Sequence, residues 1–365
     1  MRILVSFAIR LPLISTTAAW KSCICPAIKS VWKELKVSCK ISSFVLGVIL
    51  FSALCAYLSC KQCTLSHLDL SWNNIAEQGS TEFATAISYN ESLTSLNLAS
   101  NSMNDLGGQR FIHSLQFNSQ LRDVNLSQNG ISNLSCFVVA KVMKGHPSME
   151  VLDLSLNPLG EAGARAIFRT ILRGLACFVI MKGCSYKEDY TVFNNTYPSL
   201  DNPYVLDMSE PYKAAVLHQL ILKVQDDPVN CTFENLTYRD SPKSSETSVG
   251  VMVNADNKLV LKSTGEVWVP PSTGIIKFNF QQTIFVPTVK NAVDKKSLGI
   301  LQIIIEKGRT DMDRRMWLKL LCQDIYFTTN QARNLIQEFL KSKTIVHGGL
   351  SVLDIVKRFV FLMFC

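Results

Sequence analysis

The chain has 365 residues, of which 47% are hydrophobic and 18% are charged. This composition provides enough apolar side chains for packed cores, and it excludes a chain that is disordered throughout. The formal net charge is +8, and part of the excess lies in the basic N-terminal segment 1–40, where seven Lys and Arg residues accompany one Glu. A basic segment that precedes an apolar one points to a membrane and not to nucleic acid, so we expect no nucleic-acid partner.

Residues 41–60 form an apolar segment without any charged side chain, and Lys40 and Lys61 flank it. Twenty residues in a helix extend for about 30 Å, which is the thickness of the hydrocarbon core of a bilayer. One interpretation is therefore a transmembrane helix that tethers the protein to a membrane. This interpretation favours a membrane-associated location over a cytoplasmic one.

Two other interpretations of the apolar segment remain open. Cys55, Ala56 and Leu58 have the spacing of a helix that recurs further along the chain, so the segment can instead cap the core of a repeat domain. Alternatively, residues 1–50 are not a genuine N-terminus, because the repeat pattern described next stops abruptly before them.

Residues 61–184 contain a repeated pattern of leucines and asparagines. Four segments share the pattern apolar-x-x-apolar-x-Leu-x-x-Asn, and their starting positions are separated by one constant interval. The four segments are Leu65–Asn73, Leu93–Asn101, Leu121–Asn129 and Met149–Asn157. A fifth, weaker unit begins at Leu175, slightly sooner than this repeat interval would place it, with Phe178 and Ile180 in frame and Gly183 in place of the asparagine.

Each unit of this repeat predicts one strand followed by one helix. The last two apolar residues of the pattern alternate as they do on a strand, and residues such as Phe83 and Ile87 have helical spacing. No single unit can bury its apolar face alone, so the units must stack side by side. The asparagine side chains can then bond to backbone groups at each turn and form a ladder. The predicted ladder residues are Asn73, Asn101, Asn129 and Asn157.

The segment from about 65 to 183 resembles the ribonuclease-inhibitor-like class of leucine-rich repeats, whose units have this length. The resemblance implies an α/β fold: a short right-handed solenoid with parallel strands on its concave side and helices on its convex side. It also implies that the concave strands and the loops after them bind a protein partner. The implied partner-binding residues are His67, Asp69, Trp72, Asn97, Ser100, Arg122, Asn125, Gln128, Glu150, Asp153 and Leu156.

Two features of this surface have competing interpretations. Asp69, Asn97, Asn125 and Asp153 form one row across the predicted sheet, which is either a contact row or ordinary solvated polarity of exposed strands. Trp72 is either a contact anchor for the partner or a side chain that stacks on the segment at the open end of the solenoid.

Three further regions are expected after the repeats. Residues 185–248 read as an irregular connection with one helix, Tyr212–Val224, and a polar linker at 238–248. Residues 249–290 alternate as strands and predict a small antiparallel β unit. Residues 291–365 predict a helical region with helices at about 292–306, 312–325, 328–342 and 345–364. Within it, the stretch 326–339 resembles a helical domain of unknown function, a resemblance that implies no activity.

The sequence contains no P-loop, dinucleotide-binding loop, HExxH or GxSxG motif, so we expect no enzyme, no catalytic residue, no metal and no cofactor. The predicted function is a leucine-rich-repeat scaffold or adaptor that presents its concave surface to a protein partner. By fold analogy, the alternative is a regulator of a small GTPase, similar to the Ran GTPase-activating protein. Such a regulator requires an arginine or a water-orienting residue at a strand-to-helix loop, and Arg122 and Arg165 are the candidate arginines.

Overall fold

A computed structural model describes residues 44–173, 177–187, 203–283, 292–306, 311–321, 327–328 and 330–335. The first part of it alternates short strands with helices of 11 to 15 residues. Its elements are α2 (Phe44–Leu58), β1 (His67–Asp69), α3 (Ala76–Ser88), β2 (Ser95–Asn97), α4 (Asn104–Leu115), β3 (Asp123–Asn125), α5 (Asn133–Met143), β4 (Val151–Asp153), α6 (Glu161–Leu172) and β5 (Phe178–Ile180).

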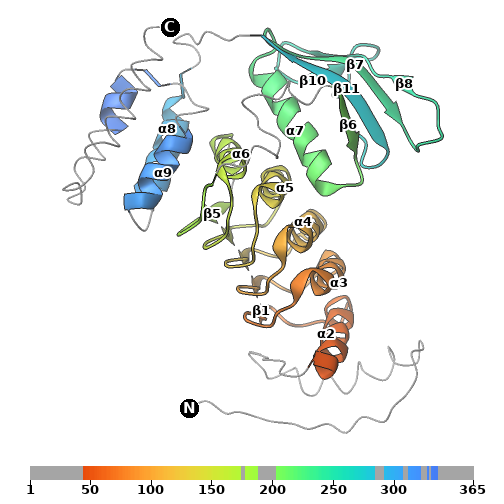
Figure 1. Cartoon of the computed structure of the whole chain (residues 1–365), viewed down its shortest axis with the longest axis vertical. Helices are drawn as coiled ribbons and strands as arrows, with labels where there is room; N and C mark the ends of the chain where they lie inside the picture. Colours follow the sequence, from red (N-terminus) through yellow and green to blue (C-terminus); the bar gives the residue numbers. More distant parts are fainter. Residues whose placement is uncertain are drawn as a thin grey trace.

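The five strands form one parallel sheet in the order β1-β2-β3-β4-β5, and the helices lie together on its other side (Figure 1). Equivalent residues of consecutive units are paired, so that Leu68 lies opposite Leu96 and Leu96 opposite Val124. The pattern leucines fill the core between strands and helices, and Leu93, Leu98, Leu126 and Leu154 have no exposed surface. The predicted stack of strand–helix units is confirmed.

The asparagine ladder is also confirmed. In three successive steps, the backbone N–H of one ladder asparagine donates to Oδ1 of the next one, over 3.1, 3.0 and 2.8 Å. The side-chain amide of Asn129 donates to the carbonyl of Leu98 at 2.9 Å, and that of Asn157 donates to Leu126 at 2.9 Å. Because Asn101, Asn129 and Asn157 are buried, the ladder satisfies backbone groups that water cannot reach.

The frame predicted for the fifth unit is wrong by one position. Leu152 pairs with Val179, one position short of the repeat interval, and Val179 is buried while Phe178 and Ile180 are only half-buried. The thiol of Cys184, and not Gly183, takes the ladder position and donates to the carbonyl of Leu154 at 3.3 Å. Phe178 and Ile180 thus join the outward-facing side of the sheet.

A second ladder, which the sequence analysis missed, lies where each helix returns to the next strand. The amide of Asn90 donates to the carbonyl of Leu58 at 2.7 Å, and Asn118 repeats the contact with Ile87 at 2.8 Å. In the next unit, Nδ1 of His146 accepts a bond from a backbone N–H at 3.0 Å. These side chains fix the ends of the helices relative to the following strands.

Helix α2 lies against α3 in the position of a repeat helix. The ring of Phe51 stacks on Phe83 at 5.9 Å between centroids, and Phe83 stacks on Phe111 at 6.1 Å. Leu58 is fully buried in the same core. Within the described residues, no helix has both the length and the apolar character that crossing a membrane requires. The segment predicted as a membrane span therefore contains a helix that covers the first repeat.

The region predicted as an irregular connection contains strands as well as the expected helix. Its elements are β6 (Tyr204–Asp207), α7 (Pro211–Asp226), β7 (Cys231–Arg239) and β8 (Thr247–Ser248). The predicted β unit that follows contains β9 (Val251–Val253), β10 (Leu259–Leu261) and β11 (Ile275–Gln282). Strands β6, β11, β7 and β8 form one antiparallel sheet in that order, and β9 and β10 form a separate hairpin. The sheet thus joins residues that the sequence analysis had assigned to two regions.

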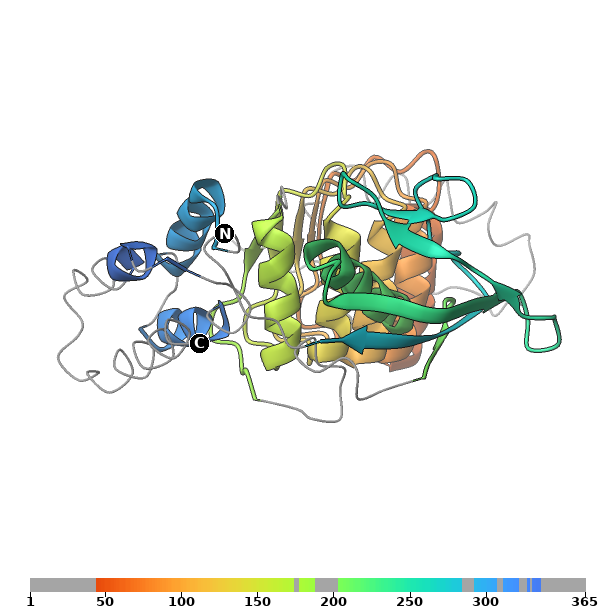
Figure 2. The ribbon, with the colours of Figure 1, turned by 90° about the horizontal axis from the view of Figure 1, so that it is seen from above.

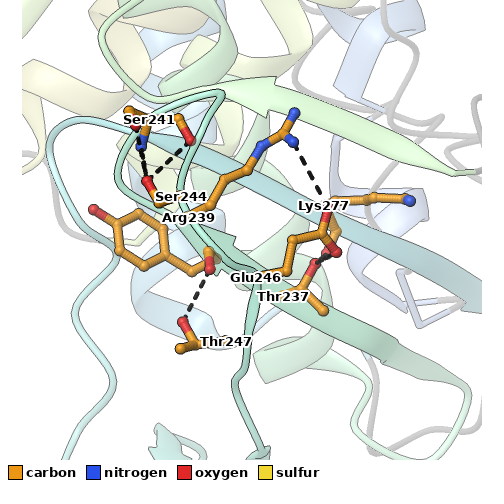
Figure 3. A network of polar contacts seen from close by, with 8 residues as sticks. Thr237, Arg239, Ser241, Ser244, Glu246, Thr247 and Lys277 are labelled. Carbon is orange, nitrogen blue, oxygen red and sulfur yellow. Dashed lines mark hydrogen bonds and ion pairs between the residues drawn. The ribbon is translucent and has the colours of Figure 1, made fainter.

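The predicted polar linker at 238–248 is a β-hairpin that polar side chains hold together (Figure 3). The hydroxyl of Thr237 donates to Oε2 of Glu246 at 3.3 Å, and the guanidinium of Arg239 lies 4.0 Å from Oε1 of the same side chain. At the turn, the backbone N–H of Ser241 donates to Oγ of Ser244 at 2.8 Å. The polar composition that indicated a linker here supplies cross-strand and turn contacts instead.

Helix α7 lies between the antiparallel sheet and the repeat helices, as Figures 1 and 2 show. The ring of Tyr212 meets that of Phe137 on α5 at 6.0 Å, and Leu217 and Leu220 are fully buried. Arg173, at the end of α6, forms an ion pair with Asp226 at the end of α7. The antiparallel sheet and α7 are therefore attached to the helix side of the repeat stack.

The C-terminal helices α8 (Lys295–Glu306) and α9 (Asp311–Leu321) cover the last repeat. Trp317 meets the ring of Phe168 at 6.2 Å and donates to the hydroxyl of Tyr186 at 2.7 Å. Thr328 and Gln331 bond to each other's backbone N–H at the start of a helical turn, as expected for a capping pair. Only residues 330–335 of the third predicted helix are described as helical, and the fourth lies outside the described residues.

Candidate functional site

The strand face consists of the outward-pointing side chains of β1 to β5 and of the residues next to them. All eleven predicted contact residues lie on this face or at its edge. Seven are exposed, namely His67, Asp69, Trp72, Arg122, Gln128, Glu150 and Leu156. Four are partly buried, namely Asn97, Ser100, Asn125 and Asp153.

The row of Asp69, Asn97, Asn125 and Asp153 has a structural role. In each case Oδ1 accepts a bond from the backbone N–H two residues later, over 2.8 to 3.1 Å. This contact stabilises the turn at which the chain leaves the strand. Asn and Asp serve the turn equally well, so the charge at this row varies without any change of backbone.

A second row, the rim row, runs along one edge of the strand face and consists of Trp72, Ser100, Gln128 and Leu156. All four have a left-handed backbone, with φ between 56° and 62°, and Gly183 follows in the fifth unit with φ 64°. Each backbone N–H of the rim row donates to a carbonyl of the next unit at 2.9 to 3.0 Å. The stacked turns therefore impose the conformation, whatever side chain is present.

The two bulky members of the rim row point into solvent. Trp72 has 66% of its surface exposed and Leu156 has 58%. Within the described residues, Trp72 is therefore not covered by a neighbouring segment at the open end of the stack, and the interpretation that it stacks on residues before position 44 lies outside the described residues. Ser100 and Gln128 lie between them and bond to each other at 3.1 Å.

The two arginines considered for GTPase regulation are placed differently. Arg122 is exposed and forms an ion pair with Glu150 at 3.0 Å on the strand face. Arg165 is buried in α6, with 5% of its surface exposed. Of these two candidate arginines only Arg122 is accessible, and its guanidinium is already paired with Glu150.

The sequence analysis missed a pair of exposed aromatic side chains at the opposite edge. Tyr89 and Phe117 are one repeat interval apart, just after α3 and α4, and are 68% and 64% exposed. The repeat spacing itself was the signal that could have identified them. A glycine, Gly145, occupies the same place in the next unit, so the row has only two members.

Most of the described cysteines are buried core residues, whereas Cys60 and Cys184 are partly exposed. Burial raises the pKa of the Cys177 thiol to about 12 and that of the Cys184 thiol to about 11, so both stay protonated at neutral pH. In the part of the chain that the structure describes, no three His, Cys, Asp or Glu side chains are grouped as metal ligands.

Comparison with protein families gives a result that agrees with this geometry. The family model described as Leucine Rich repeat matches residues 61–83, 89–111 and 145–168. The unit with β3 and α5 lies between the second and third matched segments and has the same strand, ladder asparagine and helix. No curated protein matches the sequence. The matched segments and the stacked geometry together show that this chain contains leucine-rich repeats.

Proposed function

We propose that the protein is a binding scaffold that contacts another protein through the strand face and the rim row. Leucine-rich repeats generally serve as protein-interaction scaffolds, and this one presents an exposed face of five strands. The length of the unit and the full helix in its second half support the ribonuclease-inhibitor-like class. We propose no catalytic activity for the chain.

The observation that carries the proposal is the conformation of Trp72 and Leu156. A left-handed backbone costs a residue with a side chain about 1 kcal/mol or more, and glycine adopts it without that cost. Gly183 occupies the equivalent position in the fifth unit. The chain nevertheless has a tryptophan and a leucine at two such positions and exposes both. Strained, exposed and bulky residues are typical of contact sites.

The proposal can be tested by photocrosslinking in the cells that produce the protein. A photoreactive phenylalanine derivative replaces Gln128, which is exposed in the rim row, and in a control chain it replaces Thr85, which is exposed on α3. We expect a discrete crosslinked protein from position 128 and not from position 85. The Trp72→Ala substitution should remove that product. A product from position 85 alone, or one that Trp72→Ala leaves unchanged, would overturn the proposal.

Regulation of a small GTPase receives no support from a specific observation, because Arg165 is buried and Arg122 is paired with Glu150. We therefore propose no such activity.

A further inference from the structure

We infer that the partner of the strand face presents a basic segment with an apolar side chain beside it. This inference rests on the proposed function and specifies the chemistry of the partner. It follows from the charges on the strand face, from their separation, and from the position of the exposed apolar residues of the rim row.

The strand face is acidic on a chain that is basic overall. The outward positions of β1 to β4 include Asp69, Asp123 and Asp153, and none of these positions is a lysine or an arginine. The formal net charge of the whole chain is +8. The strand face therefore has the opposite sign to the protein, which a random distribution of charges would not favour.

Among the residues that the structure describes, the other charged groups around these strands do not neutralise the three aspartates. Arg122 and Glu150 flank β3 and β4 and form an ion pair with each other, so their charges cancel. His67 shares a hydrogen bond with the neighbouring Ser66 hydroxyl. Lys182 lies beyond the end of β5, outside the four strands that hold the aspartates. The net formal charge of the outward positions on β1 to β4 therefore remains negative.

The three carboxylates are close enough to act on one ligand. Neighbouring strands lie about 4.8 Å apart, so β1 and β4 are separated by roughly 15 Å. The Debye length at physiological salt is about 8 Å, so one short basic segment across the sheet lies within reach of all three charges. Trp72 and Leu156 lie at the two ends of the same four units, where they can meet an apolar side chain.

Substitution by asparagine removes the charges of the three aspartates and keeps a side-chain oxygen that can accept the turn hydrogen bond. Asp69 and Asp153 each accept a backbone bond at their turn, and Asn97 and Asn125 make the same bond at the equivalent positions. The triple substitution Asp69→Asn, Asp123→Asn and Asp153→Asn therefore leaves the turns intact. A matched control replaces three exposed acidic residues elsewhere, Glu82→Gln, Asp256→Asn and Glu266→Gln.

The test measures binding of short fluorescein-labelled peptides to the full chain by fluorescence anisotropy. One peptide contains Lys and Leu, a second replaces Lys by Glu, and a third replaces Leu by Ser. We expect the Lys–Leu peptide to bind most tightly, and the triple Asn variant to weaken its binding about tenfold at low salt. The control variant should change the affinity by less than about twofold, and Trp72→Ala should weaken the Lys–Leu peptide more than the Lys–Ser peptide.

Three outcomes would overturn the inference: preference for the Glu–Leu peptide, equal effects of the triple variant and its control, or no difference between the variant and the native chain. Tighter binding of a synthetic peptide with the basic sequence of residues 21–40 would assign the surface to the protein's own N-terminal segment and would likewise overturn it. The crosslink from position 128 distinguishes failure of the scaffold proposal from failure of the charge inference. If that crosslink persists in the triple variant, the scaffold proposal stands and the charge inference fails.

Discussion

Helices α3 and α5 occupy equivalent places in the repeat, yet among the described residues only α5 is covered by α7 and the antiparallel sheet behind it. Glu82 on α3 and Arg110 on α4 are exposed, whereas Val138 at the same position of α5 has no exposed surface. In α6 the equivalent residue is Ala166, which is also buried. The comparison teaches that a repeat helix with an apolar outer face indicates a covering element before that element can be recognised in the sequence.

The strongest test of this comparison places the charge of α4 on α5. We expect Val138→Arg to lower the free energy of unfolding by about 3 to 5 kcal/mol, because it buries an unpaired charge under α7. Lys141 on α5 and Lys144 directly after it would add repulsion. Urea denaturation followed by circular dichroism measures the effect.

The matched control is the reverse change in the uncovered helix. Arg110→Val should alter the free energy of unfolding by no more than about 0.5 kcal/mol, because position 110 is exposed. Similar losses in the free energy of unfolding for the two variants would show that the cover provided by α7 does not make α5 differ from α4.

The next prediction concerns the ladder that the units share. We expect Asn129→Ala to lower the free energy of unfolding by about 3 kcal/mol, because the backbone N–H of Asn101 and the carbonyl of Leu98 lose a buried partner. Gln78→Ala on the exposed side of α3 is the control, with an expected change of about 0.5 kcal/mol or less. If both substitutions cost the same in urea denaturation, the ladder does not stabilise the stack.

The attachment of α7 should depend on pH. Burial, together with the nearby positive charges of Lys144, Lys141 and Arg173, lowers the pKa of His218 from 6.5 to about 3. The folded state then binds fewer protons than the unfolded state between these values, so stability falls as the pH drops below about 6.5. We expect the urea midpoint to be lower at pH 4.5 than at pH 7, and His218→Gln to reduce that difference. An equal reduction by His67→Gln, a change at an exposed histidine, would refute the assignment.

The smallest effect on stability is expected where the effect on binding is largest. Trp72→Gly removes an exposed side chain and relieves a left-handed backbone, so the free energy of unfolding should change by no more than about 1 kcal/mol. Leu70→Gly, two residues earlier in the core, should cost more than about 3 kcal/mol. A loss of stability from Trp72→Gly as large as that from Leu70→Gly would show that Trp72 is a structural residue.

Much of the strand face could be predicted because each part of it recurs. The turn aspartates and asparagines and the rim row recur at the repeat interval, and the structure places them on one surface, with the recurring ladder asparagines buried beneath it. Asp69 accepts a hydrogen bond at the turn and also contributes charge to the strand face. This combination could not be predicted, because the bond to the turn depends on a backbone geometry that the pattern does not specify. The frame of the fifth unit was missed because a single residue is absent from its step, and the half-apolar sequence around Phe178 is compatible with either frame.

The sequence by itself determined the stack, because each unit makes its contacts with the next unit along the chain and the same residues recur at each contact. The tertiary structure alone decided the antiparallel sheet, in which Tyr204 of β6 lies opposite Phe278 of β11 although the chain between them is long. It also decided that α7 covers α5 and leaves α3 exposed. Such pairings depend on which apolar faces remain after the local units have formed, and no local pattern records that choice.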